Sequence, residues 1–277
     1  MGPSLDSEYG AVKIVDIHTH LSSEEFNDDR EAAIQRALVP CEALIDIGSG
    51  TSEEAHRRSR QLAESHSSIY FTSGIHPHDA SSLGSQPKLR EEIASFLKHE
   101  KCVAVGEAGL DYYYDHSPRE PQLEVFNWQI NLAKENELPL MIHTRDAEDD
   151  TMECLKDFEG KAVFHCFTGS QKLADFAISK GFYISFSGIV TFKKADELRQ
   201  VFLSLPLENV LIETDSPYLA PDPLRGKRNE SAFIIHTAER LAALKSLQLQ
   251  EFIDQSSGNA YRLFDKMKPC RSGTIQA

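Results

Sequence analysis

The sequence predicts an α/β protein with a (β/α)8 TIM-like barrel in a single domain, and two observations lead to this prediction. First, eight short runs rich in apolar and β-branched residues recur along the 277-residue chain, with helix-like stretches between most of them. Second, several runs are almost continuously apolar, which is typical of parallel strands buried on both faces. Strands that alternate with helices favour right-handed crossovers, and eight such units close most naturally into a barrel of about 250 residues.

The predicted strands follow one another at fairly regular intervals. In chain order they are KIVDIH (13–18), EALIDIG (42–48), IYFTSGI (69–75), CVAVGEA (102–108), PLMIH (139–143), KAVFHCF (161–167), YISFSGI (183–189) and NVLIETD (209–215). Two helix boundaries stand out between them. Ser117, Pro118 and Glu120 predict a capping box with proline at the first helical position, and Gly181 after Lys180 predicts a helix end.

An open, doubly wound sheet is the competing architecture. No G-x-G-x-x-G motif follows the first predicted strand, so we expect no dinucleotide cofactor. No linker, repeat or low-complexity tract divides the chain. We therefore expect one barrel domain at residues 12–265, an N-terminal tail at 1–11 and a C-terminal tail at 266–277.

Several features bear on where the protein works. No run of 18 apolar residues occurs, so no membrane span is expected, and the opening MGPSLDSEYG lacks the basic and apolar regions of a signal peptide. The five cysteines form no C-x-x-C pair, which is typical of reduced thiols. We expect a cytoplasmic or nuclear protein that is not secreted and has no membrane partner; the sequence leaves its oligomeric state open.

The charge balance limits the partners. The chain has 29 basic and 43 acidic residues, which gives a formal net charge of -14. Such a surface repels long nucleic acids and anionic membranes. It still allows a small local basic site that binds a phosphate group.

Side chains that bind metals stand at the ends of five predicted strands. They are His18 and His20 on the first strand, Glu107 on the fourth, His143 on the fifth, His165 on the sixth and Asp215 on the eighth. The carboxyl ends of barrel strands share one face, so these side chains should converge there. Imidazole and carboxylate suit zinc, or manganese with more oxygen ligands. Six ligands exceed one tetrahedral ion and suit two ions that share a carboxylate.

A series of motifs resembles the TatD family of metal-dependent deoxyribonucleases, within the amidohydrolase-like metal hydrolases. The matching stretches are DIHTHL (16–21), GIHPHDA (74–80), VAVGEAGLDYYYD (103–115), IHTRDAEDDT (142–151), HCFTGS (165–170), SFSGIV (185–190), LIETDSPYLAP (211–221), RGKRNES (225–231) and NAYRLF (259–264). They run in order from about residue 12 to 265. The resemblance implies a TIM-like barrel, a two-metal centre and hydrolysis of phosphodiester bonds in DNA.

The resemblance also implies roles for individual residues. It assigns His18, His20, Glu107 and Asp215 to one divalent ion, and Glu107, His143 and His165 to the second, with Glu107 as the bridge. Magnesium, manganese and zinc all stay open as the two metal ions. A water activated by the two ions would attack the phosphorus, with Asp215 as its general base, so Asp215 and Glu107 are the predicted catalytic residues.

Groups that could bind phosphate lie close to these ligands in the chain. Arg225, Lys227 and Arg228 follow the eighth strand, Arg145 follows His143, and His76 and His78 end the third strand. We expect these six residues to contact the substrate. Tyr112, Tyr113 and Tyr114 are candidates for stacking on a base.

The expected function is a 3′–5′ exodeoxyribonuclease that acts on DNA strand ends, with the polarity implied by the resemblance alone. The alternative is hydrolysis of amide or ester bonds on the same metal centre, as in a D-aminoacyl-tRNA deacylase. A tRNA also carries phosphate, so the basic residues do not separate these two hypotheses. A non-catalytic adaptor would be expected to have lost ligands, and none is missing.

Overall fold

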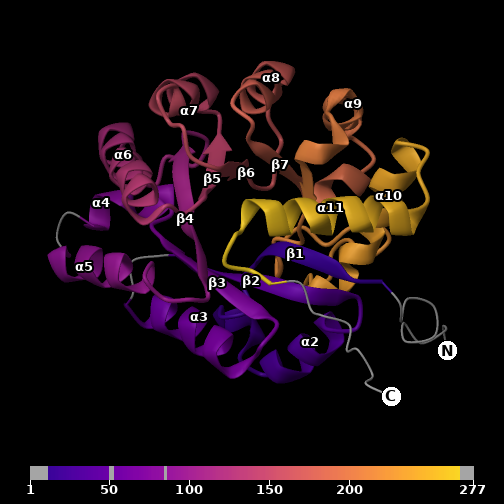
Figure 1. Cartoon of the computed structure of the whole chain (residues 1–277), viewed down its shortest axis with the longest axis horizontal. Helices are drawn as coiled ribbons and strands as arrows, with labels where there is room; N and C mark the ends of the chain where they lie inside the picture. Colours follow the sequence, from indigo (N-terminus) through magenta and orange to yellow (C-terminus); the bar gives the residue numbers. More distant parts are fainter. Residues whose placement is uncertain (1–11, 50–52, 84–85, 269–277) are drawn as a thin grey trace.

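The computed structural model describes residues 12–49, 53–83 and 86–268. Its eight strands form one parallel sheet in sequence order (Figure 1). They are β1 (Ile14–Thr19), β2 (Cys41–Ser49), β3 (Ile69–Gly74), β4 (Cys102–Asp111), β5 (Leu140–Arg145), β6 (Ala162–Phe164), β7 (Tyr183–Phe186) and β8 (Val210–Ile212). A parallel bridge between Thr19 and Ser216 joins the two ends of the sheet, which therefore curls into a nearly closed barrel. The predicted TIM-like barrel is confirmed.

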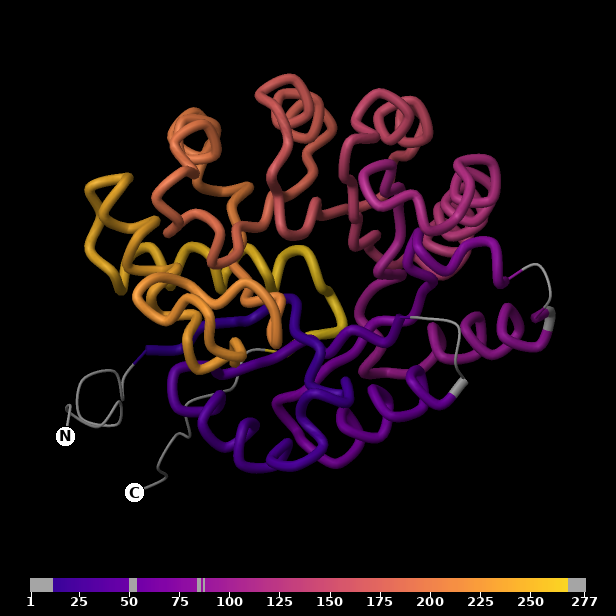
Figure 2. The backbone as a smooth tube through the Cα atoms, turned by 180° about the vertical axis from the view of Figure 1, so that it is seen from behind, coloured from indigo at the N-terminus to yellow at the C-terminus, as the bar shows by residue number. Residues whose placement is uncertain are grey.

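Helices surround the strands on the outside of the barrel (Figures 1 and 2). They are α2 (Arg30–Ala37), α3 (Glu53–Ser65), α4 (Ala80–Leu83), α5 (Pro87–Phe96), α6 (Arg119–Asn136), α7 (Glu148–Leu155), α8 (Gln171–Ser179), α9 (Asp196–Ser204), α10 (Ile234–Leu244) and α11 (Leu249–Leu263). None of these helices is both long enough and apolar enough to span a bilayer.

Helix α11 closes the amino-terminal end of the barrel. Its Leu263 and the following Phe264 pack on Val15 and Ile17 inside the barrel. The Ser257 hydroxyl accepts a hydrogen bond from the amide of Val15 at 3.2 Å, which ties this helix to the start of β1. The carboxyl ends of the strands therefore form the open face. Figure 2 shows the molecule from the side opposite to Figure 1, with the orange loop after β8 beside the indigo β1.

The predicted tails fall largely outside the described part of the chain. The predicted N-terminal tail, residues 1–11, lies outside the described residues, as do residues 269–277 of the predicted C-terminal tail. Of the remaining tail residues, Met267 is buried in the apolar cluster with Phe264. The four cysteines that the structure describes are free thiols.

Some predicted boundaries are corrected. Strands β6, β7 and β8 end earlier than predicted, so His165 and Asp215 lie in the loops just after their strands. The backbone leaves the extended region there, with φ of 42° at Cys166 and 55° at Asp215. Strand β4 instead continues to Asp111, beyond its predicted end.

The predicted capping box at Ser117 is wrong, and the helix end at Gly181 is confirmed. The Ser117 hydroxyl donates to the carbonyl of His78 at 2.7 Å, so it is engaged outside the helix. Helix α6 begins at Arg119 and has no side-chain cap. Helix α8 ends at Ser179, and Gly181 follows with a φ of +70°.

Candidate metal centre

Glu107 lies at the centre of the histidines on the open face. Its Oε1 is 2.7 Å from Nε2 of His165, 3.1 Å from Nδ1 of His143 and 3.5 Å from Nε2 of His76. Its Oε2 is 3.6 Å from Nε2 of His18. The two oxygens of one carboxylate thus face different histidines, which is the arrangement of a bridging ligand.

Asp215 occupies the other side of the cluster. Its Oδ1 lies 3.3 Å from Nε2 of His20 and 3.6 Å from Nε2 of His18. The amide of Asp215 donates to the carbonyl of His18 at 2.9 Å, which fixes the loop after β8 against β1. The structure therefore brings all six predicted ligands together on one face.

The donor atoms fit metal ions. Three sets of three ligand atoms lie within 4.8 Å of one another: His18, His20 and Asp215; His18, Glu107 and His165; and His76, Glu107 and His143. Imidazole nitrogen and carboxylate oxygen are the donors that zinc and other borderline divalent metals prefer. Because the sets share His18 and Glu107, they suit two neighbouring ions better than one.

Two buried carboxylates orient the histidines. Oδ2 of Asp111 lies 3.0 Å from Nε2 of His143, and Oε1 of Glu213 lies 3.3 Å from Nδ1 of His165. A carboxylate on one imidazole nitrogen fixes the tautomer and directs the other nitrogen at a metal. The sequence prediction did not include Asp111 or Glu213, although each stands within four residues of a predicted ligand on the same strand or the loop that follows it.

Gly109 allows β4 and β5 to approach each other at His143. It has a φ of +145°, and a Cβ at this position would lie 1.9 Å from the carbonyl oxygen of His143. A side chain here would push the two strands apart. The glycine therefore helps to keep His143 within reach of Glu107.

The electrostatics of the cluster keep Glu107 ionised. Burial alone would raise the pKa of Glu107, but His165, His76 and the hydrogen bonds from His143 and His165 outweigh it and hold the pKa well below its ordinary value. Burial would lower the pKa of His165, yet Glu107 and Glu213 raise it well above the ordinary value. A cation requires the ionised carboxylate but a neutral imidazole, so an ion bound here would displace the proton that the raised pKa favours on His165.

Comparison with known proteins agrees with this arrangement. The model of the family described as TatD related DNase matches residues 15–265. The chain belongs to the TatD-related DNase family. It is 40% identical over 259 residues to a Bacillus subtilis (strain 168) protein named uncharacterized metal-dependent hydrolase YabD, over 91% of this chain and 98% of the relative.

Two further TatD relatives are similar over nearly their whole length. The 3′-5′ ssDNA/RNA exonuclease TatD of Klebsiella pneumoniae (strain 342) is 32% identical over 258 residues, which cover 90% of this chain and 97% of the relative. The crystal structure of YJJV, a TatD homolog from Escherichia coli K12, superposes with a TM-score of 0.83 at 30% identity, over 91% and 98% of the two chains. The protein is a metal-dependent hydrolase of the TatD family.

The predicted substrate residues of this TatD protein lie in different surroundings. His76 accepts a hydrogen bond from the amide of His78 at its Nδ1, which leaves its Nε2 directed at Glu107. His78 shares Asp111 with His143, at 3.0 Å. Both histidines therefore adjoin the metal centre, and His76 lies within ligand distance of it.

The three cationic residues of the loop after β8 differ in what their side chains already contact. Arg228 is held by Asp29 through two hydrogen bonds of 2.7 and 2.8 Å, and its guanidinium covers the ring of Phe26. Lys227 is exposed, and its side chain has no hydrogen-bond or ion-pair partner within the described part of the chain. Arg225 lies 3.9 Å from the ring centroid of Phe192.

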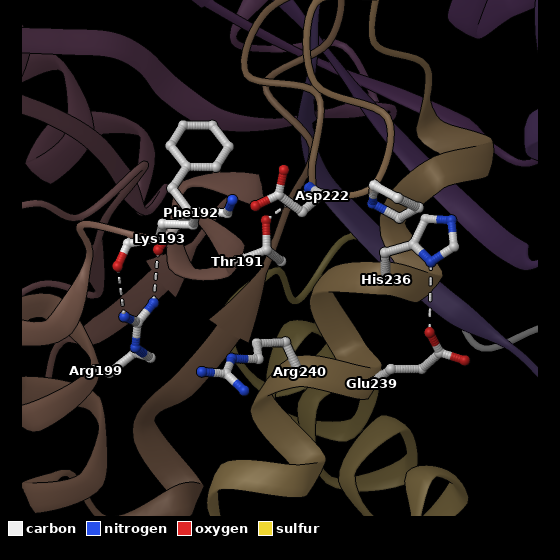
Figure 3. A pocket seen from close by; sticks show the side chains of 9 residues that line it. Thr191, Phe192, Lys193, Arg199, Asp222, His236, Glu239 and Arg240 are labelled. Carbon is white, nitrogen blue, oxygen red and sulfur yellow. Dashed lines mark hydrogen bonds and ion pairs between the residues drawn. The ribbon is translucent and has the colours of Figure 1, made fainter.

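Two open hollows lie among the loops that follow the strands of this TatD protein. One, of about 630 Å³, is lined by Tyr112, Tyr113, Arg119, Thr144 and Arg145 among others, and begins beside His143. The second, of about 620 Å³, lies between the loops after β7 and β8 and helix α10 (Figure 3). No candidate ligand lines the second hollow. There the buried Arg199 donates to the carbonyls of Val190 and Phe192, so it holds the loop rather than facing a ligand.

Tyr218 also lies beside a candidate ligand, and the sequence prediction did not include it. It is 52% exposed, and its ring meets that of His20 edge to face, with centroids 5.9 Å apart. It stands three residues after Asp215, in the LIETDSPYLAP motif. Only the exposure of its ring beside a predicted ligand separates it from an ordinary loop residue.

Proposed function

We propose that this TatD-family protein hydrolyses phosphodiester bonds at the 3′ ends of DNA strands. The observation that carries the proposal is the position of Glu107, whose two oxygens face different histidines as a carboxylate between two ions does. Two-ion sites of this kind act on the attacking and leaving oxygens of phosphate esters. The name of the Klebsiella relative, a 3′-5′ ssDNA/RNA exonuclease, supports the same reaction and polarity.

The candidate ligands would divide between two divalent ions. His18, His20 and Asp215 would hold one with Glu107, and His143 and His165 would hold the other with the same carboxylate. When bound, such ions supply Lewis-acid stabilisation of phosphate oxygens and lower the pKa of water. Asp111 and Glu213 keep His143 and His165 aligned for this role.

Asp215 is the group best placed to accept the proton of the attacking water. Its side chain is 14% exposed, whereas that of Glu107 is 4% exposed. It therefore borders solvent on the open face, while Glu107 lies beneath the histidines. A positioned carboxylate of this kind contributes roughly 10²–10⁴-fold to a rate as a general base.

Cationic groups at the rim would bind the phosphates of the strand. Arg145 ends β5, two residues after His143, and lines the adjacent hollow. Arg225 and Lys227 extend from the loop after β8, and His78 adjoins His143 through Asp111. A formal net charge of -14 disfavours contact with a long duplex, so a strand end held by a few phosphates fits the surface better.

The test is a substrate panel assayed after chelation and after restoring magnesium, manganese or zinc. It contains single-stranded DNA labelled at either end, blunt duplex DNA, RNA of the same sequence and D-Tyr-tRNA. We expect metal-dependent shortening from the 3′ end of single-stranded DNA. Full activity without metal, or hydrolysis of D-Tyr-tRNA alone, would overturn the proposal.

A further inference from the structure

Exposed aromatic rings are concentrated around the metal centre. Among the described residues, four large hydrophobic side chains are exposed: Tyr113 at 58%, Tyr114 at 51%, Tyr218 at 52% and Leu203 at 39%. The three tyrosines lie on the open face, whereas Leu203 lies on the outer helix α9. A grouping of exposed apolar side chains around a candidate site indicates a binding surface.

The rings stand on two sides of the ligands. Tyr218 packs edge to face on His20, with ring centroids 5.9 Å apart. At the other end of the cluster, Tyr114 packs edge to face on His78, at 5.4 Å, and Tyr113 packs on Tyr114, at 4.9 Å. The metal ligands lie between these two aromatic groups.

Backbone hydrogen bonds fix both groups to the centre and leave the rings at the surface. The amide of Tyr218 donates to the carbonyl of Asp215 at 2.9 Å, and Asn229 donates to the carbonyl of Tyr218 at 2.6 Å. The amides of Tyr113 and Tyr114 both donate to Oδ1 of Asp111 at 3.0 Å. Both groups of rings are thus fixed to residues of the candidate metal centre, Asp215 and Asp111.

A cation accompanies one of the groups. The guanidinium of Arg145 lies over both rings, 3.9 Å from the centroid of Tyr113 and 4.8 Å from that of Tyr114. Tyr114 is also stacked on His116, at 5.6 Å between centroids, so Tyr113 offers the more exposed ring of the two. A positive charge for the backbone together with planar rings for the bases is the usual combination in sites for unpaired strands. In a duplex, paired bases are stacked on one another and cannot offer their faces to such rings.

We propose that Tyr218 on one side, and Tyr113 with Tyr114 on the other, stack on unpaired bases that flank the scissile phosphate. This inference rests on the proposed nuclease function and narrows its substrate to strands whose bases are unpaired on both sides of the cleavage point. An aromatic residue of a protein partner is the competing occupant, and the test below distinguishes it.

The experiment moves a single non-aromatic base along a single-stranded oligonucleotide. The base is 5,6-dihydrothymine, which keeps the backbone and most hydrogen-bonding groups but loses the planar ring. In the wild type, kcat/KM should fall at least about 5-fold when this base occupies either flanking position, because stacking on one aromatic side chain contributes about 5- to 150-fold to affinity. The same base several nucleotides away should have no effect.

Variants assign each position to a ring. Tyr218→Leu should lower kcat/KM for the ordinary strand and abolish the effect of dihydrothymine at one flanking position. Tyr113→Leu combined with Tyr114→Leu should abolish the effect at the other flanking position. Tyr218→Phe should restore the sensitivity, since it restores an aromatic face. Leu203→Ala is the matched control at an exposed apolar residue away from the centre, and should leave the pattern unchanged.

Each outcome decides a different point. If the wild type cleaves no single strand, the proposed function fails. If it cleaves but shows equal kcat/KM with thymine and dihydrothymine at every position, the strand is cleaved without base stacking, and the rings serve another occupant. The base series on the wild type gives this answer even if a leucine variant does not fold.

Discussion

The carboxylate of Asp111 accepts a hydrogen bond from Nε2 of His143 across 3.0 Å, on the side of the imidazole opposite Glu107. The same Oδ2 is 3.0 Å from Nε2 of His78. Asp111 thus fixes which nitrogen of His143 is free to bind a metal. It also holds the backbone of Tyr113 and Tyr114, so one carboxylate aligns a ligand and an aromatic surface.

We expect Asp111→Asn to weaken metal binding without unfolding the barrel. Loss of the charged acceptor frees the imidazole of His143, and changes of this kind typically cost about 10- to 100-fold in metal affinity. Titration of the metal-free protein with zinc or manganese measures the effect. Asp149→Asn, at an exposed carboxylate paired with Lys172, is the control and should bind metal as the wild type does. Unchanged affinity in the Asp111 variant would mean that His143 is aligned by its packing alone.

Metal stoichiometry should separate a bridging ligand from a ligand of one ion. Glu107 faces His18 with one oxygen and His143, His165 and His76 with the other, whereas His20 contacts His18 and Asp215. We therefore expect Glu107→Ala to lose both ions and His20→Ala to lose one. Metal content per chain, measured on proteins purified in the same buffer, gives the answer. Two ions retained in the Glu107 variant would exclude its role as the bridge.

Asp215→Asn should give a folded protein with very low turnover. The amide can still occupy the space beside His18 and His20, but it cannot accept a proton. We expect kcat to fall by more than about 10²-fold, since the residue serves as both ligand and base. Single-turnover assays at saturating metal separate the loss of the base from weaker metal binding. Asp222→Asn, in the hollow away from the ligands, is the control. Near-normal turnover at saturating metal would place the base elsewhere.

In the loop after β8, Lys227 should bind substrate and Arg228 should stabilise the fold. Neutralising Lys227 should weaken DNA binding and lower the log–log salt slope by about one unit, since one phosphate contact is lost. Its melting temperature should stay unchanged. Arg228→Ala should lower the melting temperature, because it removes one of the two arginines paired with Asp29. DNA affinity is measured against salt concentration for each single variant. If both substitutions lower the salt slope equally, Arg228 also contacts the substrate.

The Arg228 contact also predicts a pH dependence. Hydrogen bonds from Arg228, then from Arg36, hold the pKa of Asp29 well below its ordinary value. A carboxyl group with a lowered folded-state pKa stabilises the fold fully above its unfolded pKa, near 3.9, and loses this contribution as pH falls towards the folded value. The stability difference between wild type and Arg228→Ala should therefore be constant near neutral pH and shrink below about pH 4. An NMR titration should show the pKa of Asp29 rising in the variant.

Much of the fold was predictable because it depends on patterns along the chain. The apolar runs at β1 to β5 are continuous enough to be recognised, and a buried parallel strand requires such a run. The six ligands follow from the same reasoning, since the carboxyl ends of parallel strands share a face. The ends of β6 to β8 were not predictable: each strand stops three residues before its predicted end, and the composition of those residues does not reveal where the backbone turns.

The sequence by itself determined the order of the strands, the face of the barrel that bears chemistry and the six residues that gather there. The tertiary structure alone decided which groups orient them. Asp111 could have been a turn residue and Ser117 a helix cap. Each was assigned by a partner distant in sequence: His143 and the carbonyl of His78. Hydrogen bonds are short and directional, so they depend on the approach of separate elements, whereas burial of an apolar run depends mainly on its own composition.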